Sequence, residues 1–257
     1  MNSINLYLAV PPEHTDSAAA KGLPIAHMIY RIGRGLHLYR ADQALKVQGG
    51  LMAIDEIGFA GGGSVSVLTN EIIRECRARN YRGIVLNLSQ NPPPLLMALT
   101  EYLTKCAQEN HLQLFVPEHL AYASTNSKVL ICTALSGGTL SGHLQTAIET
   151  YGHGRVCLEI ERVRMDFTLP ARDGQGKPLS QQEIRTITAR YRPTSFFSKE
   201  LCTYYFTYKS GGESHFVLYD NTNSIRRKLQ MGESLGIDTA FLFYPQVEDI
   251  LSGITNR

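Results

Sequence analysis

Residues 81–118 read YRGIVLNLSQNPPPLLMALTEYLTKCAQENHLQLFVPE, with two short apolar runs on either side of a helical pattern. The runs GIVLNLS and LQLFVPE have the length of strands, and their apolar residues follow one another without strict alternation. Such continuous runs are typical of parallel strands that are covered on both faces. The segment between them starts with prolines, which suit the first turn of a helix. The stretch therefore predicts a strand, a helix and a second strand parallel to the first.

The same alternation extends over most of the 257-residue chain. Helical patterns at 68–80, 92–110, 140–152 and 223–236 separate several apolar runs of strand length. These runs are INLYLAV, GLHLYRA, GLMAIDEIGF, GIVLNLS, LQLFVPE, KVLICTAL, RVCLEIER, HFVLYD and TAFLFYP. Strands that alternate with helices over this length predict an α/β fold, a (β/α)8 TIM barrel. An open, doubly wound sheet is the alternative.

Residues 171–222 interrupt this rhythm. The segment ARDGQGKPLSQQEI predicts a loop followed by a helix, and LCTYYFTYKSGGESHFVLYDN predicts a hairpin that turns at residues 210–212. Alternation along its first strand places Tyr204, Phe206 and Tyr208 on one face and Tyr205 on the other. We therefore expect one barrel over 1–257, with a small α+β insertion at 171–222 before the last strand.

The composition is that of a globular domain, with 43% hydrophobic and 19% charged residues. A net charge of +2, without long runs of Lys or Arg, gives little support for a nucleic-acid or membrane partner. The five cysteines have no CxxC spacing, which favours reduced thiols and a reducing compartment. The N-terminal apolar run is too short for a signal peptide, so a cytoplasmic location is the default expectation.

Three segments carry a resemblance to a known family. They are RGIVLNLS, KVLICTALSGGTLSGHLQTAIETYGHGRVCLEIERVRMDFTLP and SHFVLYDNTNSIRRKLQMGESLGIDTAFLFYP. In order and spacing they resemble the fourth strand, the sixth to seventh strands and the closing segment of the glycoside hydrolase family 18 barrel. The similarity is to the branch that acts on spore cortex and peptidoglycan. It implies an amino-sugar glycan as partner and a spore-associated role in a bacterium.

In that family the fourth strand ends in the pattern DGxDxDxE. The first Asp corresponds to Arg82, the second to Val85, the third to Asn87 and the Glu to Ser89. The resemblance implies that the Glu position supplies the general acid and that the preceding Asp orients the acetamido group of the substrate. A serine hydroxyl cannot donate a proton near neutral pH, because its pKa lies far above the useful range. Asn87 and Ser89 are both expected to point into the barrel.

Two further family positions differ. The Tyr and Asp that end the sixth strand correspond to Ala134 and Leu135, and Phe243 falls at or beside the Trp that floors the sugar subsite. The chain contains no Trp at all. These changes together predict a chitinase-like pseudoenzyme without hydrolytic activity.

Carboxylates at other strand ends offer replacements, because catalytic groups gather at the carboxyl ends of barrel strands. Asp55, Glu56 and Glu118 rank first. The other carboxylates, Glu159, Glu161 and Asp166, have nearby arginines as alternative partners, at positions 155, 162 and 164. The predicted ligand-binding residues are Asp55, Glu56, Asn87, Glu118, Tyr205, Tyr208 and Phe243.

No HxH or HExxH spacing occurs, so neither a metal nor another cofactor is expected. Three hypotheses for the function follow. The first is a non-catalytic protein that binds an amino-sugar glycan or acts as a scaffold. The second is an active glycosidase that uses displaced carboxylates such as Glu118 or Asp55. The third is a purely structural protein whose barrel mouth is filled.

Overall fold

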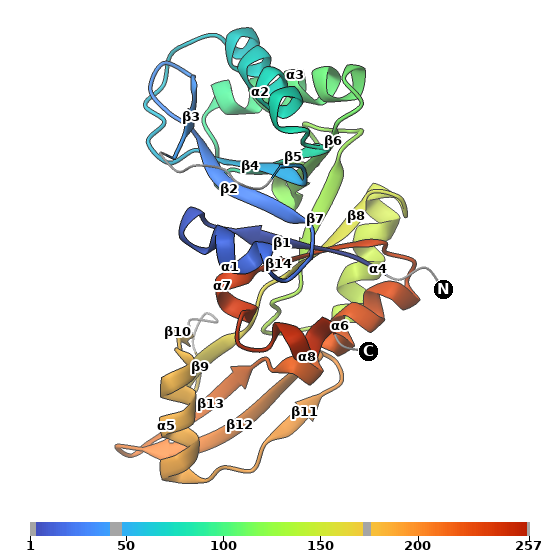
Figure 1. Ribbon diagram of the computed structural model, residues 1–257. Coiled ribbons are helices and arrows are strands. Elements are labelled where there is room, and N and C mark those ends of the chain that lie inside the picture. Colours follow the sequence, from blue (N-terminus) through green and yellow to red (C-terminus); the bar gives the residue numbers. More distant parts are fainter. Residues whose placement is uncertain (1–3, 42–47, 172–175, 256–257) are drawn as a thin grey trace.

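The computed structural model describes residues 4–41, 48–171 and 176–255. Residues 172–175, which belong to the loop expected after Ala171, lie outside these ranges. The chain forms a closed ring of eight parallel strands with flanking helices and an additional five-stranded antiparallel sheet (Figure 1). The predicted (β/α)8 barrel is therefore confirmed, and the open-sheet alternative is wrong.

Each barrel strand pairs in parallel with the next, and β1 closes the ring by pairing with both β14 and β2. Around the ring, the strands are β1 (Asn5–Val10), β2 (Ile25–Ile32), β4 (Leu51–Asp55), β5 (Gly83–Asn87), β6 (Gln113–Pro117), β7 (Lys128–Cys132), β8 (Val156–Ile160) and β14 (Thr239–Phe243).

The second barrel strand is not the one that the sequence predicted. Within the run GLHLYRA only Leu38–Arg40 forms a strand, β3, which pairs antiparallel with the end of β2. The barrel strand β2 has the sequence IAHMIYRI, in which His27 breaks the apolar run. His27 is nevertheless 1% exposed, because its Nε2 lies 3.2 Å from the Gly49 carbonyl oxygen and its ring packs on Tyr81.

Helices flank the ring. They are α1 (Thr15–Ala19), α2 (Val65–Arg79), α3 (Pro94–Glu109), α4 (Leu140–Tyr151), α6 (Thr222–Ser234), α7 (Tyr244–Val247) and α8 (Leu251–Thr255). Of these, α2, α3, α4 and α6 lie where the sequence predicted them, whereas the short helices α1, α7 and α8 were not predicted. Helix α4 ends at Gly152, whose φ of 93° suits glycine, and Asn221 caps α6 through hydrogen bonds to two backbone N–H groups. The connection from β6 to β7 contains only a short 3₁₀ helix, η2 (Glu118–Leu120).

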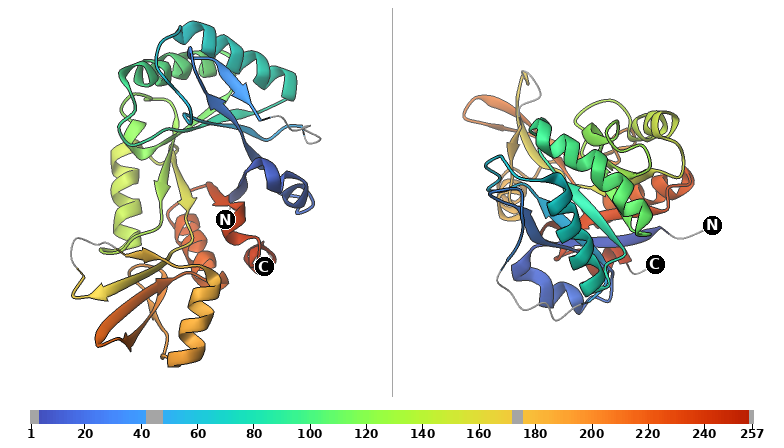
Figure 2. Two further views of the ribbon diagram at one scale, coloured as in Figure 1. Left: turned by 90° about the vertical axis from the view of Figure 1, so that its left-hand side faces the viewer. Right: turned by 90° about the horizontal axis from the view of Figure 1, so that it is seen from above.

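The insertion consists of the antiparallel sheet with one helix packed on it. Its elements are β9 (Arg164–Leu169), β10 (Lys177–Pro178), α5 (Gln181–Tyr191), β11 (Phe196–Ser198), β12 (Thr203–Ser210) and β13 (Glu213–Tyr219). The sheet begins before residue 171, because β9 follows β8 after only three residues. It projects from the barrel on the side away from α2 and α3 (Figures 1 and 2).

Alternation along β12 is as predicted. Phe206 and Tyr208 pack with Ile184 of α5, whereas Tyr205 packs on the other face with Phe216 and Val163. The insertion therefore has a small core of its own on the α5 side, and its other face joins the apolar cluster that contains Ala134 from the end of β7.

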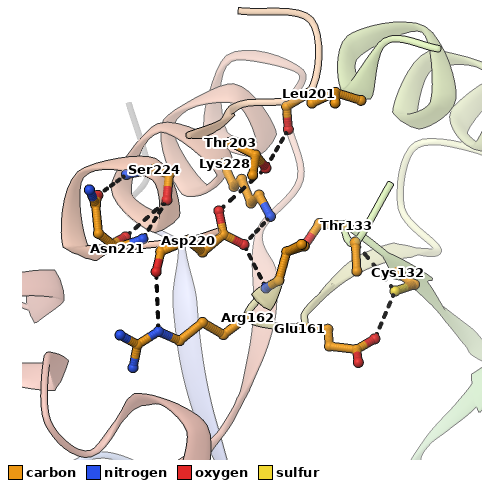
Figure 3. Close-up of polar contacts among 12 residues, drawn as sticks. Cys132, Thr133, Glu161, Arg162, Leu201, Thr203, Asp220, Asn221, Ser224 and Lys228 are labelled. Atoms are coloured by element: carbon orange, nitrogen blue, oxygen red, sulfur yellow. Dashed lines mark hydrogen bonds and ion pairs between the residues drawn. The ribbon is translucent and has the colours of Figure 1, made fainter. Parts of the chain in front are cut away.

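A buried polar network fixes the point where the chain leaves the barrel for the insertion (Figure 3). Asp220 Oδ2 accepts a hydrogen bond from Lys228 Nζ at 2.6 Å and from the Val163 N–H at 2.9 Å. The side chains of Asp220 and Lys228 are both 0% exposed. Arg162 donates to the Asp220 carbonyl at 3.3 Å and pairs with Asp249 at 2.6 Å. Because Arg162 and Val163 directly follow Glu161, the network also positions the end of β8.

Candidate functional site at the barrel mouth

The carboxyl ends of the barrel strands enclose a cavity of about 260 Å³, which we call the mouth cavity. Most of its lining is apolar and includes Ala9, Ala26, Met28, Ala53, Val85, Leu130, Phe241 and Phe243. Below it, Phe241 stacks on Tyr7 at 5.3 Å and meets Phe115 edge-on at 5.1 Å between ring centroids, so the barrel interior is filled there. In TIM barrels the carboxyl-terminal face is where active sites lie. The mouth cavity is therefore the candidate functional site.

Four polar side chains line this apolar cavity: Asn87 from β5, Glu159 and Glu161 from the end of β8, and Gln246 from α7. Gln246 is held in place, because its Oε1 accepts a hydrogen bond from the Arg162 N–H at 3.1 Å. Apolar walls with a few fixed polar groups are the usual composition of a site for a small organic ligand.

The two glutamates form the main electrostatic feature of the cavity. They are two residues apart on β8 and its extension and therefore share the inward face. Both glutamates are exposed to solvent at the mouth, although the cavity walls partly enclose the Glu159 carboxyl group. Partial desolvation, together with repulsion from Glu161, raises the pKa of Glu159. The thiol of Cys132 lies 3.6 Å from Glu161 Oε2, and burial raises the pKa of that thiol to about 11, so it stays protonated at neutral pH.

The positions that correspond to the family motif lie as follows. Arg82 is exposed just before β5, at the opposite end of the barrel from the mouth. Val85 and Asn87 line the mouth cavity, as expected for residues two apart on a strand. Ser89 does not line it: β5 ends at Asn87, and Ser89 is exposed with its N–H directed to Glu56 Oε1 at 3.3 Å. The expectation that both side chains point inward therefore holds for Asn87 alone.

Two of the highest-ranked carboxylates, Asp55 and Glu56, lie at the rim. Asp55 is half-buried at the end of β4 beside Asn87, its Oδ1 accepts from the Ile57 N–H at 2.9 Å, and burial raises its pKa. Glu56 bonds the Ser89 backbone through Oε1, while its Oε2 is buried without a hydrogen-bond partner. Neither side chain lines the mouth cavity.

Glu118 belongs to an adjoining hollow of about 880 Å³, where its Oε1 lies 3.4 Å from the Tyr151 hydroxyl. This hollow shares Pro117, Leu130 and Glu159 with the mouth cavity, so the two spaces adjoin. Glu159 is thus the one carboxylate that lines both spaces among the residues that the structure describes.

The predicted aromatic residues also differ in whether they line the mouth cavity. Phe243 lines the mouth cavity. Tyr208 is turned to the α5 side of the insertion, where its hydroxyl donates to Asp166 at 2.7 Å and its ring stacks on His215. Tyr205 lies on the other face of the insertion, stacked on Phe196 at 5.6 Å.

The nearby arginines do not neutralise the glutamates of the cavity. Arg155 donates to the carbonyls of Ser124 and Ser127, each at 2.7 Å. Arg162 is turned away from Glu161 toward Asp220 (Figure 3). Asp166 is bound by Tyr208 and His215. The alternative in which these carboxylates simply form ion pairs with their sequence neighbours is therefore wrong for Glu159 and Glu161.

Several lining residues were absent from the sequence-based set. Met28 was missed along with strand β2, and Gln246 lies in a short helix after the last strand. Glu159 and Glu161 were recognised only as secondary candidates, although their spacing of two residues already predicts a shared face. Ala134 and Leu135, at the family's Tyr and Asp positions, pack into apolar clusters and leave the cavity without the hydroxyl and carboxylate of the family.

Within the described ranges, no group of three His, Cys, Asp or Glu side chains could hold a metal ion. The same ranges contain no helix that is both long and apolar enough to cross a membrane. All five cysteines are unpaired.

Comparison with solved structures shows that this is the fold of glycoside hydrolase family 18 barrels. The chitinase of Chromobacterium violaceum superposes with a TM-score of 0.70 at 14% identity, over 98% of this chain and 100% of that one. The spore cortex-lytic enzyme SleL of Bacillus megaterium superposes with a TM-score of 0.67 at 15% identity, over 94% of this chain and 71% of that one.

A third structure, the Cycas revoluta chitinase in complex with (GlcNAc)3, gives a TM-score of 0.64 at 15% identity, over 97% of both chains. No protein-family model and no curated protein sequence matches the chain. At these identities the likeness extends to the fold, and the function has to be argued from the mouth cavity itself.

Proposed function

We propose that this protein binds an amino-sugar glycan of the chitin or peptidoglycan type at the mouth cavity and does not hydrolyse it. Support for the ligand class comes from the fold, which it shares with enzymes named as chitinases and a spore cortex-lytic enzyme. Further support comes from the cavity, whose apolar walls suit the carbon face of a sugar ring and whose amides can bond polar substituents. A spore-associated role follows from the same likeness.

One observation carries the loss of hydrolysis. The strand that supplies the family's general acid ends at Asn87, and Ser89 lies outside the cavity on the following loop. General acid catalysis contributes about 10²- to 10⁴-fold to such reactions, and neither the Ser89 hydroxyl nor the Asn87 amide can replace the acid. The residues at the acetamido-clamp positions, Ala134 and Leu135, are packed in apolar clusters. Neither proton donation nor substrate assistance is then available from the family's positions.

The test is a pair of measurements on the purified protein. Titration calorimetry with N-acetylglucosamine oligomers and peptidoglycan fragments should detect binding, and chromatography of the same ligands after long incubation should detect no products. Asn87→Phe, which fills part of the cavity, should abolish binding, whereas Asn70→Phe on the exposed surface of α2 should leave it unchanged. Binding that survives Asn87→Phe would place the ligand elsewhere.

Glu159 favours a second candidate function, a glycosidase with displaced carboxylates. The raised pKa of Glu159 is the property that a general acid needs, and its side chain lines the same cavity as that of Asn87. If product formation is detected and Glu159→Gln abolishes it while Glu101→Gln on the exposed face of α3 does not, this candidate replaces the first.

A further inference from the structure

The mouth cavity is lined by acidic side chains, and its described lining contains no basic residue. Glu159 and Glu161 face it from one strand, and Asp55 lies at its rim beside Asn87. Among the described residues, none of these three carboxylates takes part in an ion pair. Arg31 attracts Asp55, but Asp55 belongs to β4, the strand farthest from β8 around the ring.

Three basic side chains next to β8 bind other groups, and the fourth, Arg164 on β9, is attracted to Asp249. Lys128 on the neighbouring strand β7 pairs with Asp238 at 3.5 Å, at the opposite end of the barrel. Arg155 is fixed by two backbone carbonyls, and Arg162 by Asp220 and Asp249. Moving Arg155 or Arg162 to the cavity would break short hydrogen bonds, and Lys128 lies at the other end of its strand. The pair Glu159–Glu161 is therefore left for a ligand to neutralise.

Binding a neutral ligand beside Glu159 and Glu161 would cost free energy. Two carboxylates that share an apolar-lined cavity repel each other and lose part of their hydration, and filling the cavity would remove more of that water. A ligand cation between them would reverse the effect, because hydrogen bonds from a cation to a carboxylate are about twice as strong as neutral ones. The acetamido group of N-acetylglucosamine is neutral, whereas the amine of a de-N-acetylated unit is charged near neutral pH.

We infer that the sugar bound at the mouth carries a free ammonium group, which lies between Glu159 and Glu161. The ligand is then a de-N-acetylated amino-sugar glycan, as in chitosan or in peptidoglycan that has lost N-acetyl groups. Asn87 and Gln246 supply amides for the sugar hydroxyls, and Phe243 and Met28 supply apolar contact for the ring. This inference rests on the proposed glycan-binding function and names its substrate class.

The experiment compares two trimers of equal length, glucosamine trimer and N-acetylglucosamine trimer, by titration calorimetry at about pH 6.5, where an amine of this kind is largely protonated. For the natural sequence we expect the glucosamine trimer to bind at least about tenfold tighter, as one charge-assisted hydrogen bond suffices for that ratio. The double variant Glu159→Gln/Glu161→Gln should lose the preference. The matched variant Glu101→Gln, on the exposed face of α3, should keep it.

Four outcomes would count against this inference. Equal or tighter binding of the N-acetylated trimer would overturn the ammonium while leaving the glycan proposal in place. If the double variant still prefers the glucosamine trimer, the preference comes from general surface charge, and the role of the two glutamates is overturned. Binding of 1,5-diaminopentane as tightly as of the glucosamine trimer would show that the sugar is not recognised. Binding of neither trimer would overturn the glycan proposal itself, so the two failures can be told apart.

Discussion

Replacing Lys228 by methionine should destabilise the protein by about 3 kcal/mol. The ammonium lies 2.6 Å from Asp220 Oδ2, and both side chains are 0% exposed. Removing one partner of a buried pair costs about 3–5 kcal/mol, because the other charge stays buried without compensation. Here Asp220 keeps hydrogen bonds from the Val163 N–H at 2.9 Å and from Thr203 Oγ1 at 3.4 Å, which places the loss at the lower end of that range.

Urea unfolding followed by circular dichroism measures this loss as a change in the free energy of unfolding. A loss of this size is a large share of the roughly 5–15 kcal/mol that stabilises a typical domain. The matched control is Lys177→Met, which removes the exposed pair with Glu183, where the two side chains are 72% and 43% exposed. Exposed pairs contribute about 0–1 kcal/mol, so this variant should unfold almost as the natural sequence does.

The reasoning would be refuted if Lys228→Met cost no more than Lys177→Met, since the buried network would then have little energetic role. Glycan binding by the same variant gives a second measurement. Because Asp220 holds the Val163 backbone, just after Glu161 and Arg162, Lys228→Met should also weaken glycan binding at concentrations of urea where the fold is intact.

Three other outcomes are expected. The double variant Asn87→Asp/Ser89→Glu should still release no products from N-acetylglucosamine oligomers in a chromatographic assay, because the family's acetamido clamp is absent; measurable turnover would contradict this. Glu159→Gln should raise Tm at about pH 7 but not at about pH 3.5. The folded-state pKa of Glu159 lies above its unfolded-state pKa, so the natural protein loses stability as the pH rises from the unfolded-state pKa through the folded-state pKa, and a neutral Gln avoids this loss. An equal change at both pH values would be inconsistent with this assignment. Phe241→Ala should cost about 3–5 kcal/mol in urea unfolding, because the ring is 5% exposed and packs on two aromatic rings; a loss below about 1 kcal/mol would show that the barrel interior collapses around it.

The sequence determined the barrel through local patterns that need no knowledge of distant contacts. Runs such as GIVLNLS have apolar residues on both faces, so they fit only a strand that is covered on both sides. The prolines before Leu95 and the glycine at 152 set the ends of α3 and α4. The replacement of the acid by Ser89 and the hydroxyl-free Ala134 are also visible in the sequence.

Only the tertiary structure determined which segments form the strands of the ring and which charged side chains at its mouth lack ion-pair partners. The strand β2 contains His27 in the middle of its apolar run, and only contacts with the Gly49 carbonyl and Tyr81, far along the chain, make that histidine a core residue. Sequence proximity likewise suggested that Arg162 neutralises Glu161. Neighbouring residues of an extended chain point in opposite directions, so Arg162 faces away from Glu161. Its partners are Asp220 and Asp249, which come from later segments that fold back beside Arg162. Ion pairing depends on distance in space, so the fold determined that the glutamates of the mouth have no arginine partner.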